Sequence, residues 1–426
     1  MLNFASVMRR IVLLIIFMLM CIVAGAQKKE KQKEPTPLKT LLREAKTAIK
    51  NGRDQAKSVK ALQEAVARAG LTPEERAEIR YMQSTLNVSM NDGENMKAYL
   101  KQNYDTASFF NTLLDASRYA LMCDSMDTAP NAKGKVKARY RTKNRELLMR
   151  HRANIYAGGR FYLRKNNYAK AIPFFTMYID MLNEPLLSDN TSLLADTLLN
   201  RSSFYATVAA YNNNQPDVAL RYIEQAIEGA DKAQKPNLQE YKVRCLAAVG
   251  DSVNWLDALY DGCESYPLHD YFFTQLMEYF DQTGKYDYGL ELADTMLNRV
   301  QDIPLYWYCK SVMYLRQNDN DRCIAMCDSV LHRDSVHVNA WRNKGVCLLN
   351  KAIEFGEVAC YDMHNPRCRE DRKKLRRYYD EARQPFERLR QLLPERKDVW
   401  ASALYRIYLH LNMGKEFDEI EQLLKG

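Results

Sequence analysis

A period of about 34 residues in the second half of the chain is the feature that most constrains its fold. Trp341 follows Trp307 after this interval, and Trp307 follows Phe273 after the same one. Cys323 follows Gly289 after the same interval. Such a period indicates a unit of two α-helices that buries its apolar face only by stacking on neighbouring units. The spacing therefore predicts an all-α repeat protein, because repeats add residues without adding separate globular cores.

The composition agrees with a folded chain of this kind. Hydrophobic residues make up 46% of the 426 residues, and only 16 Gly and 13 Pro leave little room for low-complexity disorder. The formal net charge of +9 arises from 62 basic and 53 acidic residues, so both signs are interspersed. Such a mild excess is weak support for an anionic partner.

Residues 1–26 have the pattern of a secretory signal. Arg9 and Arg10 form a positive region, residues 11–23 form an apolar run, and a small-residue cleavage site ends at Ala26. The apolar run is too short to span a bilayer comfortably, which takes about 20 residues. We therefore expect cleavage after Ala26 and a periplasmic or secreted chain of net charge 9 − 2 = +7.

Two further features concern the start of the mature chain. Cys21 lies within the apolar run and follows Met20, where a lipobox requires a small residue, so we do not expect a lipoprotein. Residues 27–37 are charged and end in prolines, a composition that predicts a tether without a core of its own.

Residues 38–134 show helical periodicity without a consensus repeat. Gly52 follows an amphipathic segment in the manner of a helix C-cap, and Thr72 precedes a proline and two glutamates as a helix N-cap does. We expect irregular helical repeats or a helical cap here. The repeat array proper is expected over residues 135–426.

From Gly159 onward the copies share one spacing of small and aromatic residues, and this spacing is interrupted once. Gly159, Tyr162, Ala171 and Phe175 have the spacing of small and aromatic residues at which two helices cross closely. In the copy that begins at Trp341, the second helix begins later than the regular spacing predicts. That spacing places the helix-contact alanine near position 357, but an alanine that fits the pattern occurs only at Ala382. This delay predicts an insertion at about residues 355–380.

From Ile155 to the end, about two thirds of the chain, the sequence resembles tetratricopeptide-repeat proteins, particularly those exported into Gram-negative envelopes. The resemblance implies a right-handed α-solenoid of helix pairs that works as a noncatalytic binding scaffold. The lysine and asparagine clamp with which family members hold a C-terminal carboxylate is not evident, which speaks against a chaperone-tail adaptor.

The resemblance also implies a binding groove. In this family the fifth, ninth, twelfth and thirteenth residues of the first helix of each copy often line the concave face. In this sequence those positions are Tyr156, Arg160, Arg164, Phe204, Tyr211, Arg244, Glu278, Tyr308, Arg316, Arg342, Asn350 and Tyr405. Arginine and tyrosine dominate the set, as they do at protein-binding hot spots, although an arbitrary face of a chain rich in both would look similar.

Two segments are strongly basic. The first alternates basic and other residues, and the second lies in the predicted insertion. Their basic residues are Lys135, Lys137, Arg139, Arg141, Lys143 and Arg145, and Arg367, Arg369, Arg372, Lys373, Lys374, Arg376 and Arg377. Each segment is either a solvated helix face or a contact for an anionic polymer, lipid headgroup or acidic protein. We expect no nucleic-acid partner, since a secreted protein rarely meets one, and at most peripheral membrane contact.

Nine cysteines remain after the predicted cleavage. Cys323 and Cys327 occupy helix-contact positions, where cysteine acts as a compact hydrophobe. Cys360 and Cys368 flank His364 in the insertion, a spacing compatible with a local disulfide, with free thiols or, less well, with a metal that lacks a fourth ligand.

The sequence contains no phosphate-binding glycine loop and no hydrolase or metalloprotease motif. We therefore expect neither catalysis nor a cofactor or metal. The interpretation is a periplasmic scaffold for unidentified protein partners, expected among envelope proteins, in an envelope assembly or secretion process. The alternative is a protein that binds an anionic glycan or envelope polymer through its basic segments.

Overall fold

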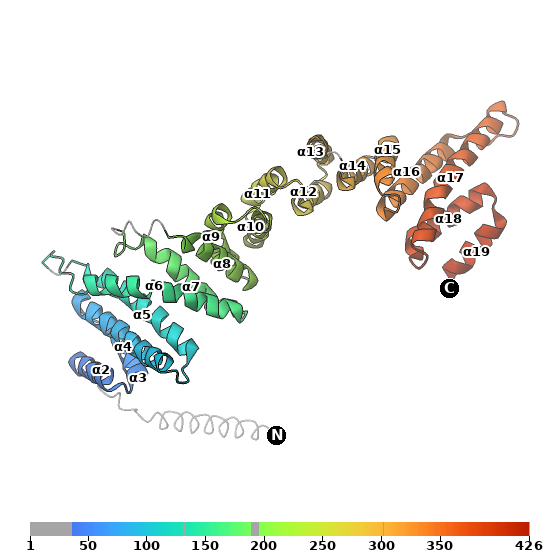
Figure 1. Ribbon diagram of the computed structural model, residues 1–426. Coiled ribbons are helices and arrows are strands. Elements are labelled where there is room, and N and C mark those ends of the chain that lie inside the picture. The colour runs from blue at the N-terminus through green and yellow to red at the C-terminus, as the bar shows by residue number, and fades with distance from the viewer. Residues whose placement is uncertain (1–35, 131–132, 189–195, 301, 426) are drawn as a thin grey trace, which may run out of the picture. The chain divides into compact units, whose positions relative to one another are not determined.

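A computed structural model describes residues 36–130, 133–188, 196–300 and 302–425. These ranges contain 18 α-helices and one short 3₁₀ helix, and no strand (Figure 1). The predicted all-α repeat architecture is confirmed. The predicted signal, residues 1–26, and nearly all of the predicted tether lie outside the described residues.

The helices form two compact units, residues 1–202 and 203–426. The helices that begin in the first unit are α2 (Leu38–Asn51), α3 (Gln55–Val66), α4 (Pro73–Tyr99), α5 (Thr106–Asp127), α6 (Arg141–Arg164), α7 (Tyr168–Asp180), η1 (Met181–Asn183) and α8 (Leu198–Asn212). Those of the second unit are α9 (Pro216–Gly229), α10 (Lys235–Val249), α11 (Ser252–Ser265), α12 (Asp270–Thr283), α13 (Tyr286–Arg299), α14 (Pro304–Arg316), α15 (Asn320–Arg333), α16 (Val338–Val358), α17 (Pro366–Leu392), α18 (Lys397–Leu411) and α19 (Gly414–Lys425).

Helix ends follow the local chemistry of the sequence. Gly52 ends α2 with φ of 65°, a left-handed conformation that glycine adopts without steric cost. At α4, the Thr72 hydroxyl accepts a hydrogen bond from the Glu75 amide, and the Glu75 carboxylate accepts one from the Thr72 amide. This reciprocal capping box satisfies two amides that the helix leaves free. Both helix boundaries that we predicted in this region are therefore present.

The α6–α7 pair shows how close the helices of one repeat approach. A Cβ atom added to Gly159 would lie 2.7 Å from the Phe175 ring, and one added to Gly158 would lie 2.5 Å from the Phe174 ring. Only glycine admits this approach, since real Cβ atoms are not found so near other heavy atoms. The small and aromatic spacing that we recognised between Gly159 and Phe175 is thus a direct contact.

The α16–α17 pair repeats that contact across a much longer connection. A Cβ atom added to Gly345 would lie 2.9 Å from the Phe386 ring. The inserted residues between them lengthen both helices: α16 has 21 residues and α17 has 27, whereas α14 has 13 and α15 has 14. In Figure 1 the far ends of α16 and α17 extend past α15 and α18. We call residues 355–380 the hairpin extension.

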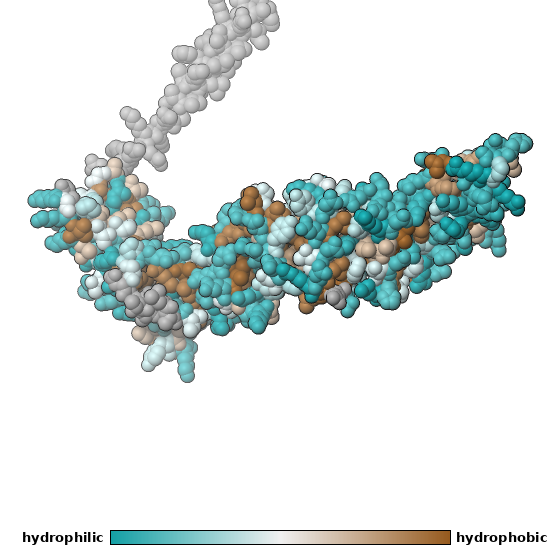
Figure 2. Space-filling model, turned by 90° about the horizontal axis from the view of Figure 1, so that it is seen from above, coloured by the Kyte–Doolittle hydropathy of each residue, from teal (hydrophilic) through white to brown (hydrophobic). Residues whose placement is uncertain are grey.

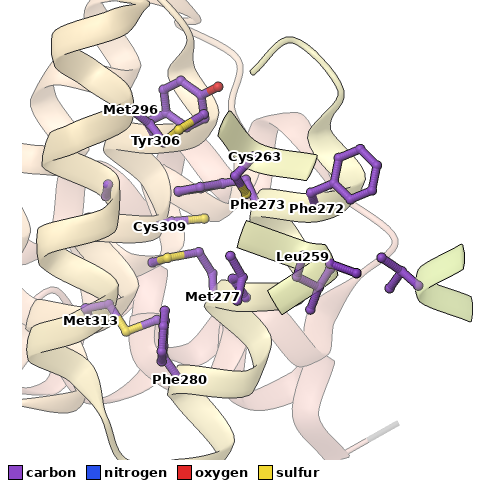
Figure 3. Close-up of a cluster of buried hydrophobic side chains, with 14 of the residues drawn as sticks. Leu259, Cys263, Phe272, Phe273, Met277, Phe280, Met296, Tyr306, Cys309 and Met313 are labelled. Atoms are coloured by element: carbon purple, nitrogen blue, oxygen red, sulfur yellow. The ribbon is translucent and has the colours of Figure 1, made fainter. Parts of the chain in front are cut away.

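The main core of the second unit lies among α11 to α14 (Figure 3). Phe272, Phe273 and Tyr306 are at most 1% exposed, and the Phe273 and Tyr306 rings meet edge to face at 4.7 Å. Methionine and cysteine side chains fill the gaps around these rings, as flexible and compact apolar groups do. In the α14 copy the fully buried aromatic residue is Tyr306, whereas its neighbour Trp307, which marks the period, is only partly buried.

Candidate functional site

The first helices of successive copies in the second unit bring aromatic and charged side chains together. Tyr211 of α8 stacks on Tyr241 of α10, with ring centroids 4.2 Å apart and an angle of 15° between the rings. One turn after Tyr241, the Arg244 guanidinium lies over the ring of Tyr271, at the start of α12, at 4.7 Å from its centroid. We call Tyr211, Tyr241, Arg244 and Tyr271 the tyrosine–arginine strip.

Further contacts hold Arg244 and Tyr271 of the strip in place. Tyr271 packs against the buried core of α11 to α14. Arg244 forms an ion pair of 2.7 Å with Glu240, on the preceding turn of the same helix, and the other oxygen of Glu240 lies 2.9 Å from Nε2 of His269. Because these contacts fix Arg244 and Tyr271, the two side chains lose little conformational freedom when a partner binds.

The ionisation of the strip suits recognition of a negatively charged or aromatic group. Burial raises the pKa of Tyr271, although Arg244 opposes the shift, so its phenol is neutral at neutral pH. Burial would lower the pKa of Arg244, but the hydrogen bond to Glu240 and the nearby tyrosines outweigh it and raise the pKa. A permanent cation therefore stands on an aromatic face, where its attraction to the ring is strengthened by partial removal from water.

Two of the twelve groove residues that we predicted, Tyr211 and Arg244, belong to this strip. Tyr241 and Tyr271 were missed because their positions are not among those that line the groove in the family. The signal for Tyr241 was present, since it lies one helical turn before Arg244 and so shares its helix face. No short-range pattern pointed to Tyr271, which reaches Arg244 from the next helix pair.

The other predicted groove residues of the second unit are more dispersed. Arg316 of α14 forms two hydrogen bonds, of 2.7 and 2.8 Å, with Asp281 of α12, which links neighbouring first helices. The Tyr308 ring lies 5.1 Å from that of His337. Tyr405 packs on Phe417 at 4.6 Å. The remaining predicted groove residues of this unit are exposed or partly exposed; they are Phe204, Glu278, Arg342 and Asn350.

In the first unit, Tyr156 is only 7% exposed and belongs to an aromatic cluster with Phe175 and Tyr178. The Arg160 guanidinium lies 6.0 Å from the centroid of Tyr156, and Arg164 is exposed. Tyr156 therefore serves packing more than recognition, and these three predicted residues do not reproduce the chemistry of the strip.

The two basic segments differ in structure. In the first, only the residues from Arg141 onward are helical. Arg141 pairs with Asp124 at 2.7 Å and donates to the carbonyl of Pro185, and Arg145 donates to the carbonyl of Leu186 at 2.8 Å. The interpretation as a solvated helix face is wrong for Arg141 and Arg145, because these arginines tie α6 to α5 and to the chain after η1.

All seven basic residues of the hairpin extension, by contrast, are exposed. Several of them surround a cleft of about 470 Å³ next to the turn between α18 and α19. Its lining is Lys373, Arg376, Arg377, Asp380, Arg383, Leu411 and Met413. Arg383 is neutralised by Asp380 and Glu387, whereas no ion pair of Arg369 or Arg376 is found in the described part of the chain.

The cysteines act mainly as packing residues. Cys323 and Cys327 are fully buried beside Cys347. Burial raises the pKa of Cys263 to about 12, so its thiol stays protonated. Cys360 and Cys368 are free thiols in the structure, and the disulfide between them stays a prediction. Among the described residues no three His, Cys, Asp or Glu side chains are grouped so that they could hold a metal ion.

A search of the helices that the structure describes finds none with the length and apolarity needed to cross a membrane.

Comparisons with known proteins concern the fold. No protein-family model matches the chain, and no curated protein matches it. Among solved structures, the C-terminal part of a TPR repeat-containing protein from Cytophaga hutchinsonii is 15% identical, over 62% of this chain and 98% of that one, with a TM-score of 0.35. The APC/C hetero-tetramer Cut9–Hcn1 is 13% identical over 88% and 78%, with a TM-score of 0.31. The TPR domain of P58(IPK) is 11% identical over 91% and 98%, with a TM-score of 0.27.

Proposed function

We propose that this chain is a noncatalytic interaction scaffold that binds a segment of a partner protein on the tyrosine–arginine strip. The observation that carries the proposal is the joining of Tyr211, Tyr241, Arg244 and Tyr271 from three successive first helices into one partly exposed surface. Tyrosine and arginine are among the side chains that most often dominate the energy of protein interfaces.

The strip favours a partner segment that carries a carboxylate next to an aromatic or apolar side chain. The carboxylate would share Arg244 with Glu240, and the apolar group would lie on the tyrosine rings. Since Glu240 already pairs with Arg244, a partner gains affinity chiefly through the aromatic contacts, and the charge sets its orientation.

The compartment of the scaffold is part of the proposal and rests on the sequence. The positive region, apolar run and small-residue site within residues 1–26 support export to the periplasm. An envelope assembly or secretion process is the setting in which an exported scaffold of this kind would act, with envelope proteins as its partners.

The test is site-specific photo-crosslinking in cells that produce the chain. A photoreactive phenylalanine analogue replaces Tyr271, and a matched control replaces Tyr288, which is 59% exposed on the second helix of its pair. We expect a discrete crosslinked protein from position 271 and none from position 288. With that protein purified, Arg244→Ala and Tyr211→Ala should each weaken its binding by roughly tenfold or more. Equal crosslinking at both positions, or unchanged affinity in both variants, would contradict the proposal.

A second candidate function is binding of an anionic glycan or envelope polymer. The observation in its favour is the cleft lined by Lys373, Arg376 and Arg377 in the hairpin extension. Such binding depends on charge and should disappear at high salt. Retention on an anionic polymer column at low salt, abolished by Arg376→Gln with Arg377→Gln but unaffected by Arg244→Ala, would favour this function over the first.

A further inference from the structure

The turn at the end of the hairpin extension exposes large apolar side chains. Val358, Tyr361 and Met363 are 66%, 65% and 71% exposed. They lie at the last residue of α16 and in the short connection to α17, a stretch of residues 358–365 that we call the hairpin tip. Large apolar residues are costly to leave in water at one spot, and a cluster of them commonly marks a contact surface.

Hydrogen bonds hold the tip in a defined shape. The Cys360 amide donates to the carboxylate of Asp371 at 2.9 Å, and Asp371 also pairs with Arg367 at 2.9 Å. The Tyr361 hydroxyl donates to the carbonyl of Gly356 at 2.8 Å. Because these contacts fix the backbone around the three apolar side chains, their exposure belongs to the folded tip and not to a frayed helix end.

Cations lie beside and behind the apolar residues. Arg367 donates to the Val358 carbonyl at 3.4 Å and Arg372 to the Met363 sulfur at 2.7 Å, and further cations follow along the first turns of α17. Residues 355–377 contain seven basic and four acidic residues, a net charge of 7 − 4 = +3. Of the acidic groups, Asp371 pairs with Arg367 and Glu370 with Lys373, while the other two are Glu357 and Asp362 near the tip. Figure 2 shows mainly hydrophilic residues over the part of the second unit that contains the hairpin extension. The exposed basic residues of α17 therefore adjoin the apolar tip.

We propose that the hairpin tip docks on the surface of an anionic lipid bilayer. Val358, Tyr361 and Met363 would enter the interfacial layer, and the arginines and lysines of α17 would lie at the level of the headgroup phosphates. Apolar side chains at the tip, with cations beside and behind them, match an interfacial layer that takes up apolar groups next to anionic headgroups. This inference does not depend on the tyrosine–arginine strip.

A protein partner fits the tip less well. A stable protein interface buries about 800 Å² on each side, and three side chains on one narrow turn offer much less than that. A bilayer places no such demand, since apolar insertion and attraction of the cations to anionic lipids add to each other.

The experiment is flotation with lipid vesicles, using the chain from Gln27 onward, which retains every helix that the structure describes and lacks the apolar run of residues 11–23. We expect binding to vesicles that contain phosphatidylglycerol and little binding to pure phosphatidylcholine. The triple variant Val358→Ser, Tyr361→Ser, Met363→Ser should lose at least tenfold in binding. Arg369→Gln with Arg376→Gln should lose roughly fivefold for each charge removed, because each cation near an anionic surface contributes separately to the attraction.

The matched control is Val253→Ser with Leu268→Ser, which removes two other apolar residues, 70% and 73% exposed, in the same unit. This variant should bind vesicles as the parent chain does. Failure of the parent chain to bind anionic vesicles would overturn the proposal, as would undiminished binding of the triple tip variant. Binding to soluble dextran sulfate that competes fully with vesicles and ignores the tip substitutions would assign the cations to an anionic polymer and overturn it too.

Discussion

The α6–α7 and α16–α17 helix pairs share one contact and differ in what lies beyond it. In both, a glycine of the first helix receives the ring of a phenylalanine from the second, Gly159 with Phe175 and Gly345 with Phe386. The second pair then continues into the hairpin extension, whose far end extends past α15 and α18 in Figure 1. The repeat core is therefore specified by a few close contacts, and the connection between its helices is free to carry another task.

The same comparison holds for the two basic segments. Near α6 the arginines form ion pairs and hydrogen bonds to carbonyls that assemble the first unit. In the hairpin extension the cations face solvent. The two segments differ because the arginines near α6 bond to carboxylates and carbonyls of other elements. In the hairpin extension the ion pairs lie within α17, and only Arg367 bonds to another element, through the Val358 carbonyl of α16 in the described part of the chain.

The largest loss of stability should come from truncating the phenylalanine that both helix pairs share. Phe175→Ala and Phe386→Ala each remove a ring that is at most 2% exposed and leave a cavity, so we expect each to cost about 3–5 kcal/mol. Denaturant unfolding, with hydrogen exchange to show which helix pair is affected, measures both. If Phe386→Ala cost much less than Phe175→Ala, the two contacts would not be equivalent.

Replacing the shared glycine with alanine should lower the free energy of unfolding by less than removing the ring does. In Gly159→Ala and Gly345→Ala the added Cβ forces the facing ring to shift, which we expect to destabilise each pair by about 1–3 kcal/mol. The same unfolding measurement applies, with Gly93→Ala, whose added Cβ has nothing within 4 Å, as the control. A neutral result at Gly345 would show that its helix pair is more loosely packed than the first.

The third prediction contrasts one arginine from each basic segment. Arg141→Gln leaves the largely buried Asp124 without its cation, which should lower the free energy of unfolding by about 1–3 kcal/mol. Adding Asp124→Asn to this variant should restore part of the lost stability. Arg376→Gln should change stability by no more than about 0.5 kcal/mol. Equal effects of the two substitutions, measured by thermal unfolding, would remove the distinction between the segments.

The smallest effect on stability is expected at the hairpin tip. The triple serine variant at Val358, Tyr361 and Met363 removes exposed side chains and one exposed hydrogen bond, from the Tyr361 hydroxyl to the Gly356 carbonyl, which water can replace. Its unfolding free energy should therefore lie within about 0.5 kcal/mol of the parent chain. A larger loss would mean that these residues support the α16–α17 pair, and single substitutions would then have to separate that support from vesicle binding.

Much of the fold was predictable because its causes are local or periodic. The cap at Thr72, the left-handed end at Gly52 and the spacing of Gly159 and Phe175 are each readable within a few turns of helix. The candidate site was less predictable. Arg244 and Tyr211 were found through the family pattern, but Tyr271 joins them from another helix pair, and no spacing within a single helix reports that contact.

By itself the sequence determined that this chain is an array of helix pairs. It also determined where the 34-residue spacing is regular and where an insertion interrupts it, because the period and the small residues at close contacts can be read directly along the chain. Only the tertiary structure decided which cations are used in packing and which remain exposed, which tyrosines stand against Arg244, and that the interruption ends in an ordered apolar tip. Those outcomes depend on which side chains of distant segments come within contact distance, and that distance is set by the packing of whole helices against one another.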